Sequence, residues 1–260
     1  MTMSELAGRK VLVVGAGTQA SPDPDAPIGN GRAISVLSGR AGATVTCADI
    51  DTDAAKATAA LVEAEGATAH VLTADVADAD ACHGLVDAAA AAMDGLDGLV
   101  CNVGIGAGMG MQGTTAEQWD HVFSVNARSH FLLASAALRT MPEGGSIVFI
   151  SSVAGLTAGS RIPAYDASKA ALTGLCRQVA AEGARKGIRA NVVAPGLIDT
   201  VLGRWATAGR PSRAKAPVPL GRQGTAWEVA EPVVFLLSDR ASYITSQVIA
   251  VDGGLTGGRG

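Results

Sequence analysis

The chain has 260 residues, of which 48% are hydrophobic, only 3% are aromatic and 33 are glycine. Its formal net charge is −4 and it contains no Lys/Arg block, which argues against a nucleic-acid partner. No apolar run reaches the roughly 18 residues of a membrane span and no signal-peptide core is present, so we expect a cytoplasmic protein without a membrane partner. The cysteines and histidines lack metal-ligand spacing, so no metal site is predicted.

The N-terminal half alternates short apolar runs with helical patterns. A strand is predicted at residues 10–14, followed by Gly15-Ala16-Gly17 and a turn-rich segment from Thr18 to Pro27. Ile28-Gly29 then opens a helix that continues to Arg40. The next predicted elements are strands at 44–48, 69–73 and 98–101, and helices at 54–65 and 78–93.

The C-terminal half continues this alternation. Its predicted elements are helices at 115–141, 163–186 and 228–238, strands at 146–150, 189–194 and 248–251, and a variable Arg/Pro-rich segment at 199–219. Apolar strands separated by helices are typical of a parallel sheet that is covered on both faces. We therefore predict an α/β fold, a doubly wound Rossmann-type sheet of about seven strands, in one domain spanning residues 1–260.

The first strand, glycine turn and helix predict a site that places a pyrophosphate on helix N-terminal amides. Asp49 ends the next strand, about 20 residues past the turn, where a carboxylate accepts hydrogen bonds from ribose hydroxyls. The same carboxylate repels a 2′-phosphate, so NAD is favoured over NADP. The alternative is that Asp49 is a solvated residue that caps the next helix, a role that Asp51 or Asp53 suits equally.

The stretch from Ser151 to Lys169 suggests proton chemistry. Pro163 suits the first turn of a helix, and Tyr165 and Lys169 lie four residues apart on one face of it. Ser152 lies on the loop that follows a predicted strand. A phenol, an ammonium and a hydroxyl that converge there outline a proton-transfer site, whereas the alternative is an incidental pair on an exposed helix face.

Over nearly its whole length the chain resembles the short-chain dehydrogenase/reductase family. The resemblance rests on motifs in a fixed order: Gly15 with Ile28-Gly29, Asp49, Asp75-Val76, Cys101-Asn102-Val103-Gly104, Asn126, Ser152, Tyr165, Lys169, Pro195-Gly196 and Val251-Asp252-Gly253-Gly254. The glycine turn departs from the family's Thr-Gly-x-x-x-Gly-Ile-Gly pattern. Val14 replaces the threonine, Pro27 replaces the middle glycine, and additional residues separate Gly15 from Ile28.

The resemblance implies an NAD(H)-dependent oxidoreductase that interconverts a secondary alcohol and a ketone. It makes Tyr165 the general acid/base and assigns Lys169 to the nicotinamide ribose, where its charge favours the phenolate. Ser152 would orient the substrate oxygen, and Asn126 would hold a water relay. The implied cofactor contacts are Gly15, Gly17, Thr18, Ile28, Gly29, Asp49, Ile50, Asp75, Val76, Asn102, Gly104, Tyr165, Lys169, Pro195, Gly196, Ile198 and Thr200.

The implied partners are a small-molecule substrate, with residues 199–219 as its lid, and three further copies of the chain in a homotetramer. Two alternatives remain open at this point. An NADPH-dependent 3-oxoacyl-thioester reductase is disfavoured by Asp49. A non-catalytic nucleotide-sensing scaffold predicts the loss of at least one member of the Asn126, Ser152, Tyr165 and Lys169 tetrad, and the sequence retains all four.

Overall fold

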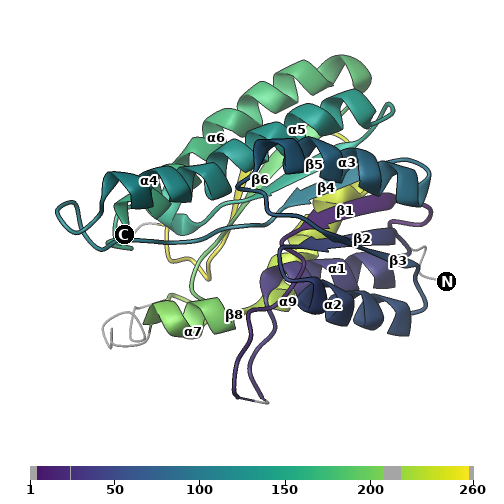
Figure 1. The fold of residues 1–260 in the computed structure, drawn as a ribbon. Helices are drawn as coiled ribbons and strands as arrows, with labels where there is room; N and C mark the ends of the chain where they lie inside the picture. Colours follow the sequence, from purple (N-terminus) through teal and green to yellow (C-terminus); the bar gives the residue numbers. More distant parts are fainter. Residues whose placement is uncertain (1–4, 24, 208–217, 258–260) are drawn as a thin grey trace.

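A parallel sheet runs through the centre of the molecule. The computed structural model describes residues 5–23, 25–207 and 218–257. Seven strands pair in the order β3-β2-β1-β4-β5-β6-β9, with helices over both faces (Figure 1). These strands are β1 (Lys10–Val14), β2 (Thr44–Asp49), β3 (Ala69–Thr73), β4 (Gly98–Cys101), β5 (Ser146–Ile150), β6 (Arg189–Pro195) and β9 (Val248–Val251). The predicted doubly wound α/β fold is confirmed.

Each face of the sheet carries its own apolar core. Val11 and Val13 of β1 face a core formed with α1 (Asn30–Arg40), α2 (Thr52–Ala64) and α9 (Ala226–Leu237). The alternate residues Leu12 and Val14 face the core formed with α3 (Ala79–Met93), α5 (Ser129–Thr140) and α6 (Pro163–Gly183). Because both faces are covered at the centre of the sheet, the central strands β1, β4 and β5 carry apolar residues on both sides, as their sequences indicate.

The strand order reverses at β1. The chain winds outward through β2 and β3 on one side, and then returns to place β4, β5 and β6 on the other side. In open sheets of this kind a crevice forms at the carboxyl ends of the strands where the order reverses. The loops after β1 and β4 therefore diverge around the expected ligand position.

The predicted long helix at 115–141 is interrupted. It consists of α4 (Ala116–Phe123), a π-helical turn at Ser124–Arg128, and α5. In this turn the amide of Ser129 donates to the carbonyl oxygen of Ser124, five residues earlier. A π-turn inserts one extra residue into a helix and rotates the residues that follow it, and such turns are common at functional sites.

The segment expected to form the lid contains a short strand and a helix. β7 (Ile198–Asp199) pairs with β8 (Gly224–Thr225), and α7 (Val201–Thr207) follows β7. The remaining described elements are 3₁₀ turns at Val153–Gly155, Ala184–Lys186 and Asp239–Ala241. The part of the predicted lid at 208–217 lies outside the described residues.

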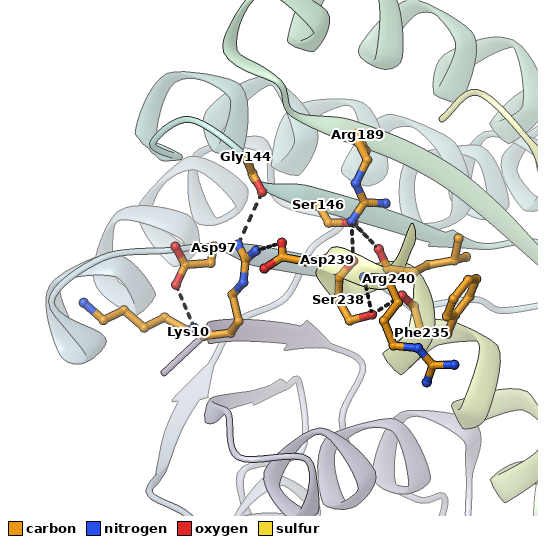
Figure 2. Close-up of polar contacts among 11 residues, drawn as sticks. Lys10, Asp97, Gly144, Ser146, Arg189, Phe235, Ser238, Asp239 and Arg240 are labelled. Atoms are coloured by element: carbon orange, nitrogen blue, oxygen red, sulfur yellow. Dashed lines mark hydrogen bonds and ion pairs between the residues drawn. The ribbon is translucent and has the colours of Figure 1, made fainter. Parts of the chain in front are cut away.

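Polar contacts join the amino ends of the strands, at the edge opposite the crevice (Figure 2). The buried guanidinium of Arg189 donates to the carbonyl oxygens of Leu236 at 2.7 Å and Ser238 at 3.0 Å. At the start of β1, the amide of Lys10 donates to Oδ2 of Asp97 at 2.9 Å. These bonds connect α9 and the loop before β4 to the first residues of β6 and β1. They stabilise the edge of the sheet that lies opposite the crevice.

Candidate active site

A cavity of about 520 Å³ opens at the carboxyl ends of the strands. It lies where the strand order reverses, and residues that directly follow β1, β2, β4, β5 and β6 line it. Most of the sequence-predicted site residues line this cavity: Gly15, Gly17, Thr18, Gly29, Asp49, Ile50, Asn102, Gly104, Ser152, Tyr165, Lys169, Pro195, Gly196, Ile198 and Thr200.

Helix α6 brings Tyr165 and Lys169 to the cavity. Pro163 is its first residue, and the spacing of four places the two side chains on the same face. The Lys169 Nζ lies 5.9 Å from the centroid of the Tyr165 ring. The hydroxyl of Ser151 donates to the Lys169 carbonyl at 2.8 Å, which ties the helix to the end of β5.

Lys169 is buried, with 2% of its surface exposed. Its Nζ donates to the carbonyl oxygens of Ile150 at 2.9 Å and Val103 at 3.3 Å. An ammonium has three protons, so one donor remains for a ligand. Burial lowers the pKa of the Lys169 ammonium from 10.5 to about 8, which leaves the side chain mostly charged at neutral pH. A Cβ on Gly104 would lie 2.8 Å from this Nζ, so a side chain there would displace the ammonium.

Ser152 begins the loop that follows β5. Its Oγ accepts the amide of Ala154 at 3.2 Å and lines the same cavity as Tyr165 and Lys169. A hydroxyl that accepts this bond keeps its own proton available for another acceptor. The phenol, ammonium and hydroxyl expected to share a site are therefore brought to one cavity.

Asn126 does not line the cavity. It lies in the π-turn, is fully buried, and its Oδ1 accepts the amide of Ile105 at 2.8 Å. Its Nδ2 donates to the Ile105 carbonyl at 2.8 Å and to Ser168 Oγ at 3.0 Å. Both ends of the amide are therefore occupied, and the side chain holds the segment after β4 against α6.

Asp49 faces the glycine turn. Its Oδ2 accepts the amide of Gly17 at 2.8 Å, and its Oδ1 accepts the amide of Asp51 at 3.1 Å. Asp51 caps α2 by accepting the amides of Asp53 and Ala54, so Asp49 is not the helix cap. Each carboxylate oxygen has a second lone pair, and Asp49 lines the cavity, so it can accept further hydrogen bonds from a ligand.

The glycine turn has a different register from the one expected. Gly29 is the N-cap of α1, its amide donates to Thr18 Oγ1 at 2.9 Å, and the helix begins at Asn30 rather than at Ile28. A Cβ on Gly31 would lie 1.8 Å from the carbonyl oxygen of Gly15. Gly29-Asn30-Gly31 therefore takes the position in the family's glycine motif that was expected for Pro27-Ile28-Gly29. Pro27 lies before this motif, so the amide hydrogen that a proline lacks is not missing from it.

Three predicted cofactor contacts lie away from the cavity lining. Val76 is buried in the core beside α3, Ile28 packs against the core beside α1, and the Asp75 carboxylate accepts the amide of Ala77 at 2.9 Å. Other cavity residues were not predicted, notably Gln19, Ala20, Asn30 and Gly31. The two glycines Gly29 and Gly31 are the sequence signal from which this register could be predicted, because only glycine tolerates such close backbone approach.

Within the described ranges, no group of three or more His, Cys, Asp or Glu side chains is arranged to hold a metal ion. Over the same part of the chain, no helix combines the length and the apolar composition needed to cross a membrane.

Comparisons with known proteins agree with the fold and the motifs. A family profile described as enoyl-(acyl carrier protein) reductase matches residues 27–256. The chain is 38% identical to 2-(S)-hydroxypropyl-CoM dehydrogenase 3 of Xanthobacter autotrophicus, over 88% of this chain and 92% of that protein. It is 42% identical to a relative from the same organism, named inactive 2-(S)-hydroxypropyl-CoM dehydrogenase 2, over 84% and 96% of the two chains.

A solved structure from Agrobacterium tumefaciens, with bound NADP, covers 99% of this chain and all of its own with a TM-score of 0.86 and 32% identity. The relatives, the profile and the seven-stranded sheet all point to one group of oxidoreductases. The chain belongs to the short-chain dehydrogenase/reductase family.

Proposed function

We propose that the protein is an NAD(H)-dependent oxidoreductase that interconverts a secondary alcohol and a ketone. The observation that supports this most strongly is a single cavity lined by Tyr165, Lys169 and Ser152 together with Asp49. A proton-transfer group and a ribose-binding carboxylate are the two components that such a reaction needs from the chain.

The residues present suit a nicotinamide dinucleotide. Gly15, Gly29 and Gly31 leave room for close backbone approach at the start of α1, where unpaired helix amides attract phosphate. Asn30 lines the same cavity, and its buried Oδ1 has no hydrogen-bond partner among the described residues, so a donor supplied by a ligand would satisfy it. Gly17, Gly29 and Asp49 would hold the adenosine half, and Lys169 would bind the nicotinamide ribose. A bound nicotinamide supplies or accepts the hydride.

The protein's own residues handle the proton. In alcohol oxidation the Tyr165 oxygen accepts the hydroxyl proton, and in ketone reduction it returns a proton to the substrate oxygen. The Lys169 ammonium, held by two carbonyls, stabilises the phenolate form. Ser152 donates to the substrate oxygen and orients it. Because both ends of its side-chain amide are hydrogen-bonded, we assign Asn126 the role of positioning Ile105. A water relay for the proton at this residue would therefore bind to its main chain.

The preference for NAD rests on Asp49. Lys169 is the only Lys or Arg among the described residues that line the cavity, and it lies on α6 rather than beside Asp49. Arg32, close to Asp49, is engaged by Thr58 Oγ1 at 3.0 Å. Arg32 does not line the cavity, so a 2′-phosphate there would meet the Asp49 carboxylate before any described Lys or Arg side chain of the lining. The alternative is an NADPH-dependent 3-oxoacyl-thioester reductase, for which the NADP-bound structural neighbour is the favouring observation.

A second candidate comes from another class, a nucleotide-sensing scaffold without activity. The relative named as inactive favours it. This candidate predicts a missing or displaced proton donor, whereas Tyr165, Lys169 and Ser152 here line one cavity. We therefore favour the catalytic function.

For the assembly, we propose a single 260-residue domain in a homotetramer, located in the cytoplasm. Trp119 of α4 and Phe131 of α5 are exposed, at 37% and 53%, on helices that a partner subunit would cover. All four cysteines are free and buried, which suits a reducing compartment.

The test is a panel of secondary alcohols and ketones, assayed with NAD(H) and with NADP(H) by absorbance of the reduced nicotinamide. We expect turnover of at least one pair with a higher kcat/KM for NAD(H). A higher kcat/KM with NADP(H) would refute the cofactor assignment. Tight binding of either dinucleotide without turnover of any compound would favour the scaffold.

A further inference from the structure

The loop between β1 and α1, described at residues 15–23 and 25–29, contains the additional residues that the family pattern lacks. Its first part, Gln19 and Ala20, lines the cavity. From there the loop extends away from the sheet and lies beside α7 (Figure 1). Leu202 and Gly203 of α7 line the same cavity. Two segments about 180 residues apart in the sequence therefore form neighbouring walls of one site.

Arg204 joins these two walls. Its Nε donates to Oδ1 of Asp199 at 2.7 Å and its Nη2 donates to Oδ2 of Asp199 at 3.0 Å, a two-point contact. Its Nη1 faces Oδ2 of Asp23, in the loop, at 3.4 Å. The hydrogen bond from Arg204 also lowers the pKa of the Asp199 carboxyl. We name this Asp199–Arg204–Asp23 arrangement the clasp.

Asp23 is oriented by its own loop. Its amide donates to Ser21 Oγ at 3.2 Å, and its Oδ1 accepts the amide of Asp25 at 3.0 Å. Its carbonyl oxygen accepts the amide of Ala26 at 3.1 Å. These local bonds use one carboxylate oxygen and leave the other, Oδ2, for Arg204.

Arg204 projects from a segment that is fixed to the body of the protein. β7 pairs with β8, and the amide of Gly203 donates to Thr200 Oγ1 at 3.0 Å. A Cβ on Gly203 would lie 2.2 Å from the carbonyl oxygen of Ile198, so the turn into α7 is tightly packed. Arg204 therefore projects from a tightly packed turn, and its contact with Asp23 links this turn to the loop.

We propose that Arg204 is a positioning residue that ties the β1–α1 loop to α7 beside the cofactor cavity and thereby slows the release of the dinucleotide. This inference rests on the proposed function, because it needs a dinucleotide in the cavity. The side chains of Arg204 and Asp23 are about half exposed, at 51% and 48%. An exposed ion pair is weak and screened by salt, so the effect is modest, roughly two- to five-fold in the release rate.

The experiment measures NADH and NADPH release from the full-length protein by stopped-flow displacement, followed by nucleotide fluorescence. Asp23→Asn removes the loop side of the clasp and leaves the contact between Arg204 and Asp199. Asp25→Asn is the matched control, since it makes the same charge change in the same loop. Arg204→Gln and the Asp23→Asn/Arg204→Gln double variant complete the cycle, and Asp23→Glu tests rescue by the conservative change.

We expect Asp23→Asn to release the dinucleotide roughly two- to five-fold faster than Asp25→Asn, and Asp23→Glu to restore most of the difference. In the Arg204→Gln background, Asp23→Asn should have no further effect. Raising NaCl from about 0.02 M to about 0.5 M should accelerate release from the wild type and not from Asp23→Asn.

Equal release rates from Asp23→Asn, Asp25→Asn and the wild type would overturn the clasp, as would additive effects in the cycle. Melting temperatures within the range of the wild type establish that each variant is folded. If neither dinucleotide binds the wild type, it is the proposed function that fails. If one binds and the Asp23 variants behave as the control, only the clasp fails.

Discussion

Lys169 combines a positive charge with almost complete burial. The ammonium must stay charged to favour the phenolate of Tyr165, yet it is almost fully buried. Two carbonyl oxygens, from Ile150 and Val103, compensate part of the desolvation by accepting hydrogen bonds from the ammonium. The four-residue spacing in the sequence predicts that Tyr165 and Lys169 share a helix face. It carries no information about these carbonyls, because they belong to strand ends distant in sequence.

The Asp49 carboxylate is expected to bind the adenosine ribose and to repel a 2′-phosphate. Asp49→Ala should weaken NADH binding about 10-fold or more, because the ribose hydroxyls lose an ionised acceptor. NADPH binding should weaken less or improve, because the like charge is gone. Fluorescence titration with both dinucleotides measures this. Tighter NADPH than NADH binding by the wild type would contradict the role given to Asp49.

Among the elements, sequence patterns are insufficient at three places: the glycine turn, the π-turn, and the segment with β7 and α7, for which no strand or helix is predicted. The additional residues after Gly17 obscure the register, so the sequence predicts Ile28-Gly29 as the motif, whereas the chain uses Gly29-Asn30-Gly31. Residues 115–141 do have helical periodicity. One extra residue in a helix leaves the apolar pattern almost intact, so this periodicity does not predict the π-turn. Strand and helix positions were otherwise predictable, because their apolar patterns are determined by burial against the sheet.

Gly31 packs directly against the main chain of the glycine turn, so a side chain at this position should disrupt the turn. Gly31→Ala would place a Cβ 1.8 Å from the Gly15 carbonyl oxygen, so α1 must shift away from β1. We expect a loss of at least about 3 kcal/mol in the free energy of unfolding, with a large loss of dinucleotide affinity. Urea denaturation and NADH titration measure the two effects.

Gly84, in α3, is the matched control, because a Cβ there meets nothing within 4 Å. Gly84→Ala should stabilise the protein by about 0.5–1 kcal/mol, since alanine suits a helix better. Gly31→Ala with wild-type stability would show that the turn can relax and that the assigned register is not essential.

For the molecule as a whole, the pH dependence of stability involves a residue outside the cavity lining. His130 of α5 is fully buried, and its ring stacks on Phe149 with centroids 6.2 Å apart. Burial, and secondarily the nearby Lys169 charge, lower the pKa of His130 from 6.5 to about 3. Between these two pH values the unfolded chain binds one more proton than the folded chain. Stability is therefore lost as the pH falls from 6.5 toward 3.

We predict that His130→Gln weakens this dependence. Between pH 7.5 and 5, the wild type should lose about 2 kcal/mol more than the variant in the free energy of unfolding. Urea denaturation at the two pH values measures the difference. Parallel pH profiles for the two proteins would mean that His130 is charged or accessible in the folded state. The sequence did not reveal this burial, because a histidine on a helix is compatible with either a solvent or a core face.

The proposed mechanism depends most on Tyr165 as the proton donor and acceptor. The most direct measurement compares the wild type with Tyr165→Phe, which removes only the phenolic oxygen, in NADH binding and in turnover of the best pair from the panel. We predict that NADH affinity changes by about two-fold or less, while kcat falls by about 10²–10⁴-fold. A variant that retains more than about a tenth of the wild-type kcat, well above the loss expected for a general acid/base, would contradict the account.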